Sequence, residues 1–217
     1  MKALEIVKNV LNQILYQDVE FQHALRQAFK DHPEDKEHSS LVSAIVGCEL
    51  RHHYLFQRIV SDLGTDYTDE QKCLLYASLA NNLFLKRIEH DEMIDYVRQA
   101  FNEEQMIIID KLLAFQDSPR ELIPESIPVE SYEYLSLRFN TPEWLVKMWQ
   151  KHFGRGVTYK LLKKNNKPQL QSCRVNTLAT STKEVLDDNP EFREAPLADM
   201  VVYQGKAPIR KNAFFQS

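Results

Sequence analysis

The first half of this chain has the apolar periodicity of α-helices almost throughout. This feature constrains the possible fold more than any other feature of the sequence. Near the N-terminus, apolar residues recur at the spacing of a buried helical stripe, at Leu4, Val7, Leu11, Ile14 and Leu15. The same reasoning predicts further helices over about 19–29, 40–63, 69–86, 92–100 and 103–115. The first half is therefore expected to be a helical bundle.

Capping residues mark several of these helix boundaries. Thr68 with Gln71 has the capping-box pattern, and Gly64 is a plausible end for the preceding helix. We expect N-caps also at Ser39 or Ser40, at Asp91 and at Asn102. These signals predict where the helices begin and end.

Gly47 stands inside the longest expected helix. Glycine costs a helix interior about 1 kcal/mol relative to alanine, and close approach of another helix is the usual compensation. A tight helix crossing in the core is therefore expected at Gly47.

A proline-rich stretch interrupts the helical pattern at 116–141. Pro119, Pro124 and Pro128 break helices, and the stretch shows no helical stripe. A new helix is expected after it, capped by Asn140 or Thr141, with Trp144, Leu145, Met148 and Trp149 as its apolar face. A further helix is expected over about 155–165, followed by a strand pattern at 169–179, a short helix at 181–189, and short strands or turns at 200–209 and 212–217. The predicted fold class is mainly α, with a bundle over 1–125 and, over 126–217, a linker, two helices and a small α/β subdomain.

Charge is unevenly distributed between the two parts of the chain. Residues 1–130 carry 13 Lys or Arg and 23 Asp or Glu, a net charge of −10, whereas residues 131–217 carry 14 and 8, a net charge of +6. No run of about 18 apolar residues is present, so no membrane span or membrane partner is expected. The amphipathic N-terminus differs from a signal peptide, and the three widely spaced cysteines suggest a reducing cytoplasm.

The most basic segment runs over residues 138–176. It holds nine Lys or Arg and a single acid, Glu143, with Trp144, Trp149 and Tyr159 among the cations. Such a segment is typical of a surface that attracts a phosphate backbone. Two alternatives stay open: a solvated helix surface, and lysines that complement the dipole of a helix C-terminus. The two Trp side chains are expected in the core.

Other chemistry receives little support from the sequence. Cys48, His52 and His53 lie close together on one helix, but without a second ligand pair they do not predict a zinc site, and no metal ligand is assigned. No catalytic residue is assigned either, and Cys173 beside Arg174 is expected to be a buried strand thiol. Gly154-Arg155-Gly156 follows a helix and lacks a third glycine, so it does not predict a cofactor loop.

Three motifs of the basic segment resemble a known family. They are Thr141-Pro-Glu-Trp-Leu-Val with Trp149, Leu161-Leu-Lys-Lys-Asn-Asn-Lys-Pro168, and Cys173-Arg-Val-Asn-Thr-Leu178. This series is similar to one in bacterial rRNA cytosine-C5 methyltransferases of the Sun (RsmB) family. The helix around Gly47 likewise resembles a helix of the NusB-like domain with which that family begins. The resemblance departs from the NusB pattern at Asp110 and Ala114, where an Asn and an Arg are usual.

The resemblance implies an N-terminal portion of a longer enzyme. Its bundle would be NusB-like, and the catalytic methyltransferase domain, with the family's two cysteines and its S-adenosylmethionine site, would follow residue 217 as an intramolecular partner. No cofactor is expected in this chain itself, which should be inactive alone. Its implied role is to bind small-subunit rRNA in the cytoplasm and present one cytosine. The expected RNA-binding residues are Lys147, Lys151, Arg155, Lys160, Lys163, Lys164, Asn165, Asn166, Lys167, Arg174 and Asn176. For Arg174 and Asn176, the favoured role is hydrogen bonding that fixes the subdomain, and the other is a place at the edge of the RNA groove.

Two other functions remain compatible with the sequence. A stand-alone NusB-like adaptor would bind RNA through the basic part and a protein partner through the acidic helices. A helical oligomerisation module would form a stable oligomer without affinity for RNA.

Overall fold

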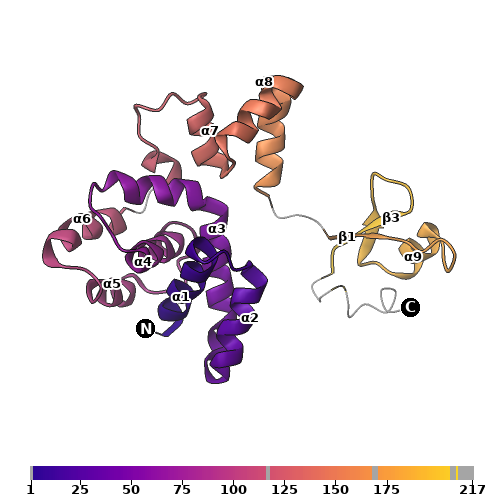
Figure 1. Ribbon diagram of the computed structural model, residues 1–217. Helices are drawn as coiled ribbons and strands as arrows, with labels where there is room; N and C mark the ends of the chain where they lie inside the picture. The colour runs from indigo at the N-terminus through magenta and orange to yellow at the C-terminus, as the bar shows by residue number, and fades with distance from the viewer. Residues whose placement is uncertain (1, 116–117, 168–170, 206–208, 210–217) are drawn as a thin grey trace. The chain divides into compact units, whose positions relative to one another are not determined.

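The computed structural model describes residues 2–115, 118–167, 171–205 and 209. They fall into two compact units, residues 1–163 and residues 164–217. The first is helical and the second carries a small antiparallel sheet, so the fold is mainly α with a small α/β unit, as predicted (Figure 1). Among the described residues, no helix combines the length and apolarity that crossing a membrane requires.

Six helices form the bundle of the first unit. They are α1 (Lys2–Tyr16), α2 (Phe21–Asp31), α3 (Ser39–Asp62), α4 (Asp69–Ala80), α5 (His90–Arg98) and α6 (Glu103–Leu113). Every residue of α4 from Cys73 to Ala80 is buried, because α1, α3 and α5 pack around it (Figure 1). A helix that is apolar on all sides belongs at the centre of a core. Leu4, Val7 and Leu11 of α1 are fully buried, which confirms the predicted stripe.

Side chains cap several of these helices as expected. Thr68 and Gln71 form a reciprocal capping box at the start of α4, and Asn102 forms one with Gln105 at α6. Gly64, with φ +67°, follows the end of α3 in the left-handed conformation that glycine favours. These contacts are local, so the sequence alone predicts them.

Three local predictions were wrong. Ser39 and Ser40 lie inside α3, because a 3-10 helix over Pro33–His38 runs directly into it. Asp91 lies in the first turn of α5, which begins at His90. Gly47 is not at a tight crossing, since no atom outside its own helix backbone lies within 4 Å of the position that a Cβ would occupy.

The proline-rich stretch contains a helix that its sequence pattern did not reveal. After a 3-10 turn at Pro119–Leu122, α7 (Tyr132–Phe139) is capped by Ser131, whose Oγ accepts a hydrogen bond from Tyr134 N–H at 3.0 Å. Eight residues give barely two turns, too few for a recognisable period. Leu135, Leu137 and Phe139 are nevertheless buried.

Asn140 attaches α7 to α3. It ends α7 in the left-handed conformation, φ +45°, instead of capping the next helix as expected. Its side-chain amide donates to Leu50 O at 2.8 Å and accepts from Tyr54 N–H at 2.9 Å, both on α3. Arg58 of α3 also pairs with Glu133 of α7 at 2.5 Å. Residues 126–163 therefore belong to the same compact unit as the bundle, and the division into domains 1–125 and 126–217 stays a prediction.

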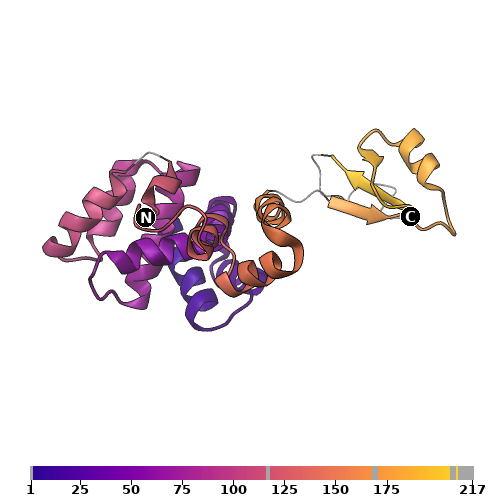
Figure 2. The ribbon, with the colours of Figure 1, turned by 90° about the horizontal axis from the view of Figure 1, so that it is seen from above.

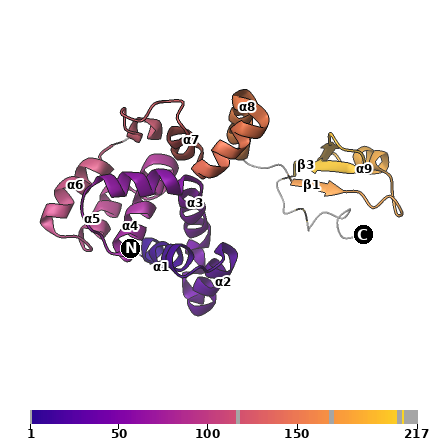
Figure 3. The same cartoon turned by 45° about the horizontal axis from the view of Figure 1, so that its top comes forward.

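The α8 helix (Glu143–Asn165) consists of two arms joined by a bend at Gly154. Gly154 has φ +74° and ψ 166°, backbone angles that are essentially restricted to glycine. Figures 2 and 3 show the arms, residues 143–153 and 155–165, running in different directions. Two helices were predicted here, with the second beginning near Arg155.

The second unit is a three-stranded antiparallel sheet with one helix. The strands β1 (Gln171–Arg174), β3 (Met200–Tyr203) and β2 (Phe192–Glu194) are ordered β1-β3-β2, and α9 (Thr182–Asp188) packs on β2 and β3. Its core contains Val175, Val185, Phe192, Val201 and Tyr203, with Cys173 partly buried against them. The strand predicted at 169–179 is observed over Gln171–Arg174, whereas residues 177–179 form a turn. The helix predicted at 181–189 is confirmed as α9, and the expectation for 212–217 lies outside the described residues.

Candidate nucleic-acid interface

The first arm of α8 carries two of the predicted RNA-binding residues on its surface. Lys147 and Lys151 are exposed and one helical turn apart. The Lys147 ammonium lies 3.1 Å from Glu143 Oε2 and 5.4 Å from the centroid of the Tyr132 ring. Glu143 is the single acid of the basic segment, so most of the segment's positive charge has no acidic neighbour in sequence.

The second arm carries a denser group of cations. Arg155, Lys160, Lys163 and Lys164 are all exposed. Arg155 pairs with Glu130, which precedes α7. Among the described residues, no carboxylate lies within 4.0 Å of the ammonium groups of Lys151, Lys160, Lys163 or Lys164. Lys160, Lys163 and Lys164 have the i, i+3, i+4 spacing that places side chains on neighbouring positions of one helix surface.

The remaining predicted residues lie at the end of α8 and in the second unit. Asn165, Asn166 and Lys167 are exposed, and the Lys167 N–H donates to Lys164 O at 3.1 Å. Arg174 is exposed on β1. Asn176 accepts a hydrogen bond from Leu178 N–H through its side chain at 3.2 Å, a contact that fixes the turn after β1.

The apolar side chains of α8 do not all face the core. Trp144 is 65% exposed and Met148 is 41% exposed, so the prediction that they form a buried face was wrong. Val146 and Leu162 are buried instead, with Trp149 packed partly against them. Val146 and Leu162 pack with Leu135 and Phe139 of α7, and Trp144 is not part of this cluster.

Arg138 was missed as a candidate functional residue. Its guanidinium carbon lies 5.1 Å from the centroid of the Phe139 ring and 5.8 Å from those of Tyr134 and Tyr159. Its Nε atom is buried and has no hydrogen-bond acceptor among the described residues. Arg138 belongs to the basic segment in sequence, but only the unexpected α7 helix brings the three rings around it.

The cysteine and histidines of α3 have packing roles. Cys48 is buried, and burial raises the pKa of its thiol to about 11. The His52 ring stacks on Phe84 at 3.9 Å between centroids, and burial, with Arg51 as a second cause, lowers the pKa of His52 to about 4. His53 Nδ1 lies 2.5 Å from Oε1 of the fully buried Glu49. Each of these side chains is therefore buried or already in contact with another side chain of the bundle.

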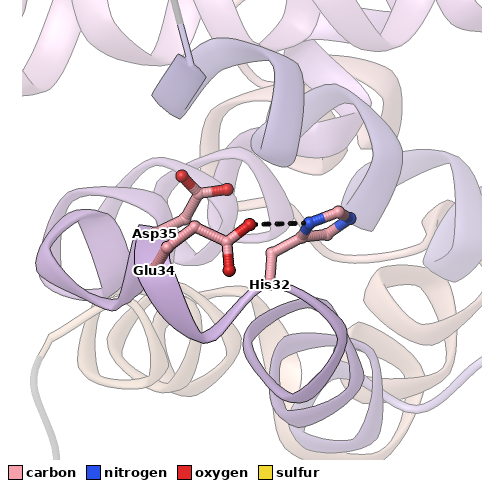
Figure 4. A group of neighbouring side chains, drawn as sticks. All are labelled: His32, Glu34 and Asp35. Atoms are coloured by element: carbon pink, nitrogen blue, oxygen red, sulfur yellow. Dashed lines mark hydrogen bonds and ion pairs between the residues drawn. The ribbon is translucent and has the colours of Figure 1, made fainter.

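One cluster of metal-ligand side chains occurs elsewhere in the described part of the chain. Ligand atoms of His32, Glu34 and Asp35 lie within 4.8 Å of one another (Figure 4). However, His32 Nδ1 already lies 3.2 Å from Glu34 Oε1, and Lys2 Nζ lies 3.7 Å from Asp35 Oδ2. Two of the three residues are exposed and each group already has a charged or polar neighbour, so we assign no metal to it.

Comparison with known proteins relates the basic segment to a methyltransferase family. Residues 141–188, which include α8, β1 and α9, match the family described as "Methyltr_RsmF/B-like, ferredoxin-like domain". No curated protein matches the chain.

A solved structure resembles the chain over almost its whole length. The chain matches PH0851, from "Crystal Structure of PH0851", with a TM-score of 0.56 and 18% identity over 99% of this chain and 51% of that one. The likeness shows a shared fold, and the chain spans about half the length of PH0851. Residues 141–188 are therefore similar to the ferredoxin-like domain of RsmF/B-like methyltransferases, and the chain shares the fold of about half of PH0851.

Proposed function

We propose that this chain is the RNA-binding, substrate-positioning N-terminal region of an S-adenosylmethionine-dependent rRNA cytosine-C5 methyltransferase. In this role the helices of residues 1–125 are a NusB-like domain, and α8 binds the RNA backbone. The observation that carries the proposal is the group of exposed cations on α8, most of them without a carboxylate partner among the described residues. The family match over residues 141–188 supports the enzyme class.

The physical basis is the electrostatics of phosphate recognition. Lysines that bind phosphates release counterions from the nucleic acid, which makes the affinity fall as salt rises. Such contacts position an RNA without reading its sequence. A methyltransferase needs this positioning, since the target base must leave its stack before it can react.

The Gly154-Arg155-Gly156 stretch does not have the form of a loop that binds S-adenosylmethionine. Gly154-Arg155-Gly156 lies at the bend between two helical arms, not between a strand and a helix. We therefore assign the methyl donor to another part of such an enzyme and no residue of this chain to its binding. The 217-residue chain alone is expected to transfer no methyl group from S-adenosylmethionine to rRNA.

A charge-neutralisation experiment tests the proposal. The variant Lys160→Gln/Lys163→Gln/Lys164→Gln is compared with Lys30→Gln/Lys36→Gln/Lys111→Gln, which changes the net charge equally at exposed lysines of other elements. Binding to small-subunit rRNA hairpins is measured by fluorescence anisotropy across salt concentrations. We expect the α8 variant to lower the affinity about 10- to 100-fold and to reduce the salt slope by about 2 to 3, because three phosphate contacts are lost. Equal affinities and slopes for the two triple variants would refute the proposed interface.

A further inference from the structure

A cavity of ≈ 540 Å³ lies between the bend of α8 and the α7 region. Gln150 of the first arm, Arg155, Tyr159 and Lys160 of the second arm, and Arg138 of α7 line it. The bend at Gly154 changes the direction of the helix between the two arms. Residues of both arms therefore line the same cavity. The volume is within the roughly 300–1,000 Å³ that is usual for small-molecule sites.

Three cations line this cavity and only one has a carboxylate partner. Arg155 pairs with Glu130, whereas Arg138 and Lys160 have no carboxylate within 4.0 Å among the described residues. The Arg138 guanidinium lies among aromatic rings, which attract its charge but leave the Nε proton without an acceptor. The cavity is therefore suited to an anion.

Glu130, whose carboxylate pairs with Arg155, also lines the cavity, and much of the remaining wall is apolar or aromatic. Val129 and Leu135 line one part, and Tyr159, which is 38% exposed, offers its ring. A cationic pocket with an aromatic wall fits a group that combines a phosphate with a flat ring. Nucleotides of single-stranded RNA have this chemistry, and aromatic side chains stack on any base.

We infer that this cavity binds one unpaired nucleotide of an RNA strand. The phosphate is held by Arg138, Arg155 and Lys160, and the base packs against Tyr159. The site continues into the row of Lys160, Lys163 and Lys164, which favours a polymer with repeated phosphates over an acidic peptide. This inference rests on the proposed RNA binding of α8 and adds to it a defined pocket and two residues, Arg138 and Tyr159.

Substitution of Glu130 provides a test in which the affinity for RNA is expected to increase. The Glu130 carboxylate forms an ion pair with the Arg155 guanidinium, and an RNA phosphate that binds Arg155 would displace it. Glu130→Gln is therefore expected to strengthen binding of a fluorescein-labelled oligouridine 10-mer several-fold. Glu125→Gln makes the same charge change at another exposed glutamate of the same loop and serves as the matched control. Equal affinities for the two variants would overturn the inference.

Tyr159 separates base contacts from phosphate contacts. Tyr159→Leu is expected to weaken 10-mer binding about tenfold without changing the salt slope, and Tyr159→Phe is expected to bind as wild type, because the ring stacks on the base. An abasic 10-mer should bind equally to wild type and to Tyr159→Leu. Since Tyr159 also contacts Phe139, photocrosslinking of a 4-thiouridine 10-mer to folded wild type provides a second readout, with crosslinks expected at residues 150–160.

The outcomes distinguish this inference from the proposed function. In one outcome the Lys160/Lys163/Lys164 variant loses affinity, but Tyr159→Leu and Glu130→Gln bind like their controls and no crosslink maps to residues 150–160. This outcome would show that α8 binds RNA and that the cavity does not. If all variants bind alike, the proposed function fails as well. An oligoglutamate 10-mer that competes as well as the RNA would assign the cavity to an acidic peptide and overturn the inference.

Discussion

At the scale of single residues, long-range polar contacts decide how this chain is divided. The Asn140 side chain lies between Leu50 O and Tyr54 N–H, the acceptor and donor that an α-helix pairs with each other. One side chain thus fixes α7, and through it the start of α8, to the bundle.

Substitution of Asn140 should therefore lower stability by two separable amounts. Asn140→Gly keeps the left-handed conformation but removes both hydrogen bonds, and α3 can then restore its own bond, so we expect a loss of about 1 kcal/mol. Asn140→Ala is expected to lower the free energy of unfolding by about 1 kcal/mol more than Asn140→Gly, because alanine disfavours φ +45°. Urea unfolding measures both losses. Equal stabilities of the two variants would contradict the strained conformation at this position.

His52 should make the stability of the chain depend on pH. Burial lowers its pKa to about 4, so between pH 4 and pH 6.5 the unfolded chain binds the proton that the folded chain does not. Its contribution is therefore fully present above pH 6.5 and is lost as pH falls, by roughly 2 kcal/mol at pH 5. The free energy of unfolding is measured for wild type and His52→Gln at pH 7 and at pH 5. Between these two pH values the free energy of unfolding should fall less in His52→Gln than in wild type. An identical pH dependence would show that His52 does not titrate in this way.

At the scale of elements, the bend in α8 is the feature with the largest consequences. Without it, a continuous helix would carry the cations of residues 147–164 around its whole surface. With it, Gln150 and Tyr159 line one cavity with Arg138. Gly154 permits the bend through its backbone conformation, since no neighbouring atom lies within 4 Å of the position of a Cβ.

Alanine substitutions at the two glycines of α8 should therefore have opposite effects. Gly154→Ala is expected to destabilise the first unit by about 1–3 kcal/mol, because alanine does not tolerate these backbone angles. Gly156→Ala, in helical conformation with open space around it, is expected to stabilise it by up to about 1 kcal/mol. Thermal unfolding followed by circular dichroism measures both. A stabilised Gly154→Ala variant would mean that α8 runs straight in solution.

At the scale of the whole molecule, two units with cores of very different size share one chain. The first unit buries many apolar residues from α1 to α7, whereas the core of the second contains five buried residues among those that the structure describes. Small domains bury a smaller fraction of their surface and are correspondingly less stable. The second unit is therefore expected to unfold at lower denaturant concentrations than the first.

The three cysteines report on the two units separately. Burial raises the pKa of the Cys48 and Cys73 thiols to about 11 and about 12, and Cys173 is only partly buried in β1. Because the thiolate is the reactive form, Cys48 and Cys73 should resist alkylation until the first unit unfolds. Alkylation with iodoacetamide at increasing urea, mapped by mass spectrometry, should modify Cys173 first. A single midpoint for all three would indicate one cooperative unit.

Sequence alone predicts what depends on neighbours along the chain. The capping boxes at Thr68 and Asn102, the end of α3 at Gly64 and the break between the arms of α8 all involve residues within four positions of one another. The short α7 helix and the exposure of Trp144 were not predicted, because contacts with distant residues determine both. The same is true of the open space around Gly47.

The candidate site divides in the same way. Its charge is a property of composition, so the excess of lysine and arginine over residues 138–176 identifies the basic segment without a structure. The placing of Arg138 among three rings, its cavity and the Glu130–Arg155 pair depend on how α7 and α8 pack. The helices, the charge and the family resemblance can be predicted from the chain alone, because periodicity, composition and motifs are read along the sequence. Which cations share a pocket can be learned only from the fold, because it depends on side chains that folding brings together.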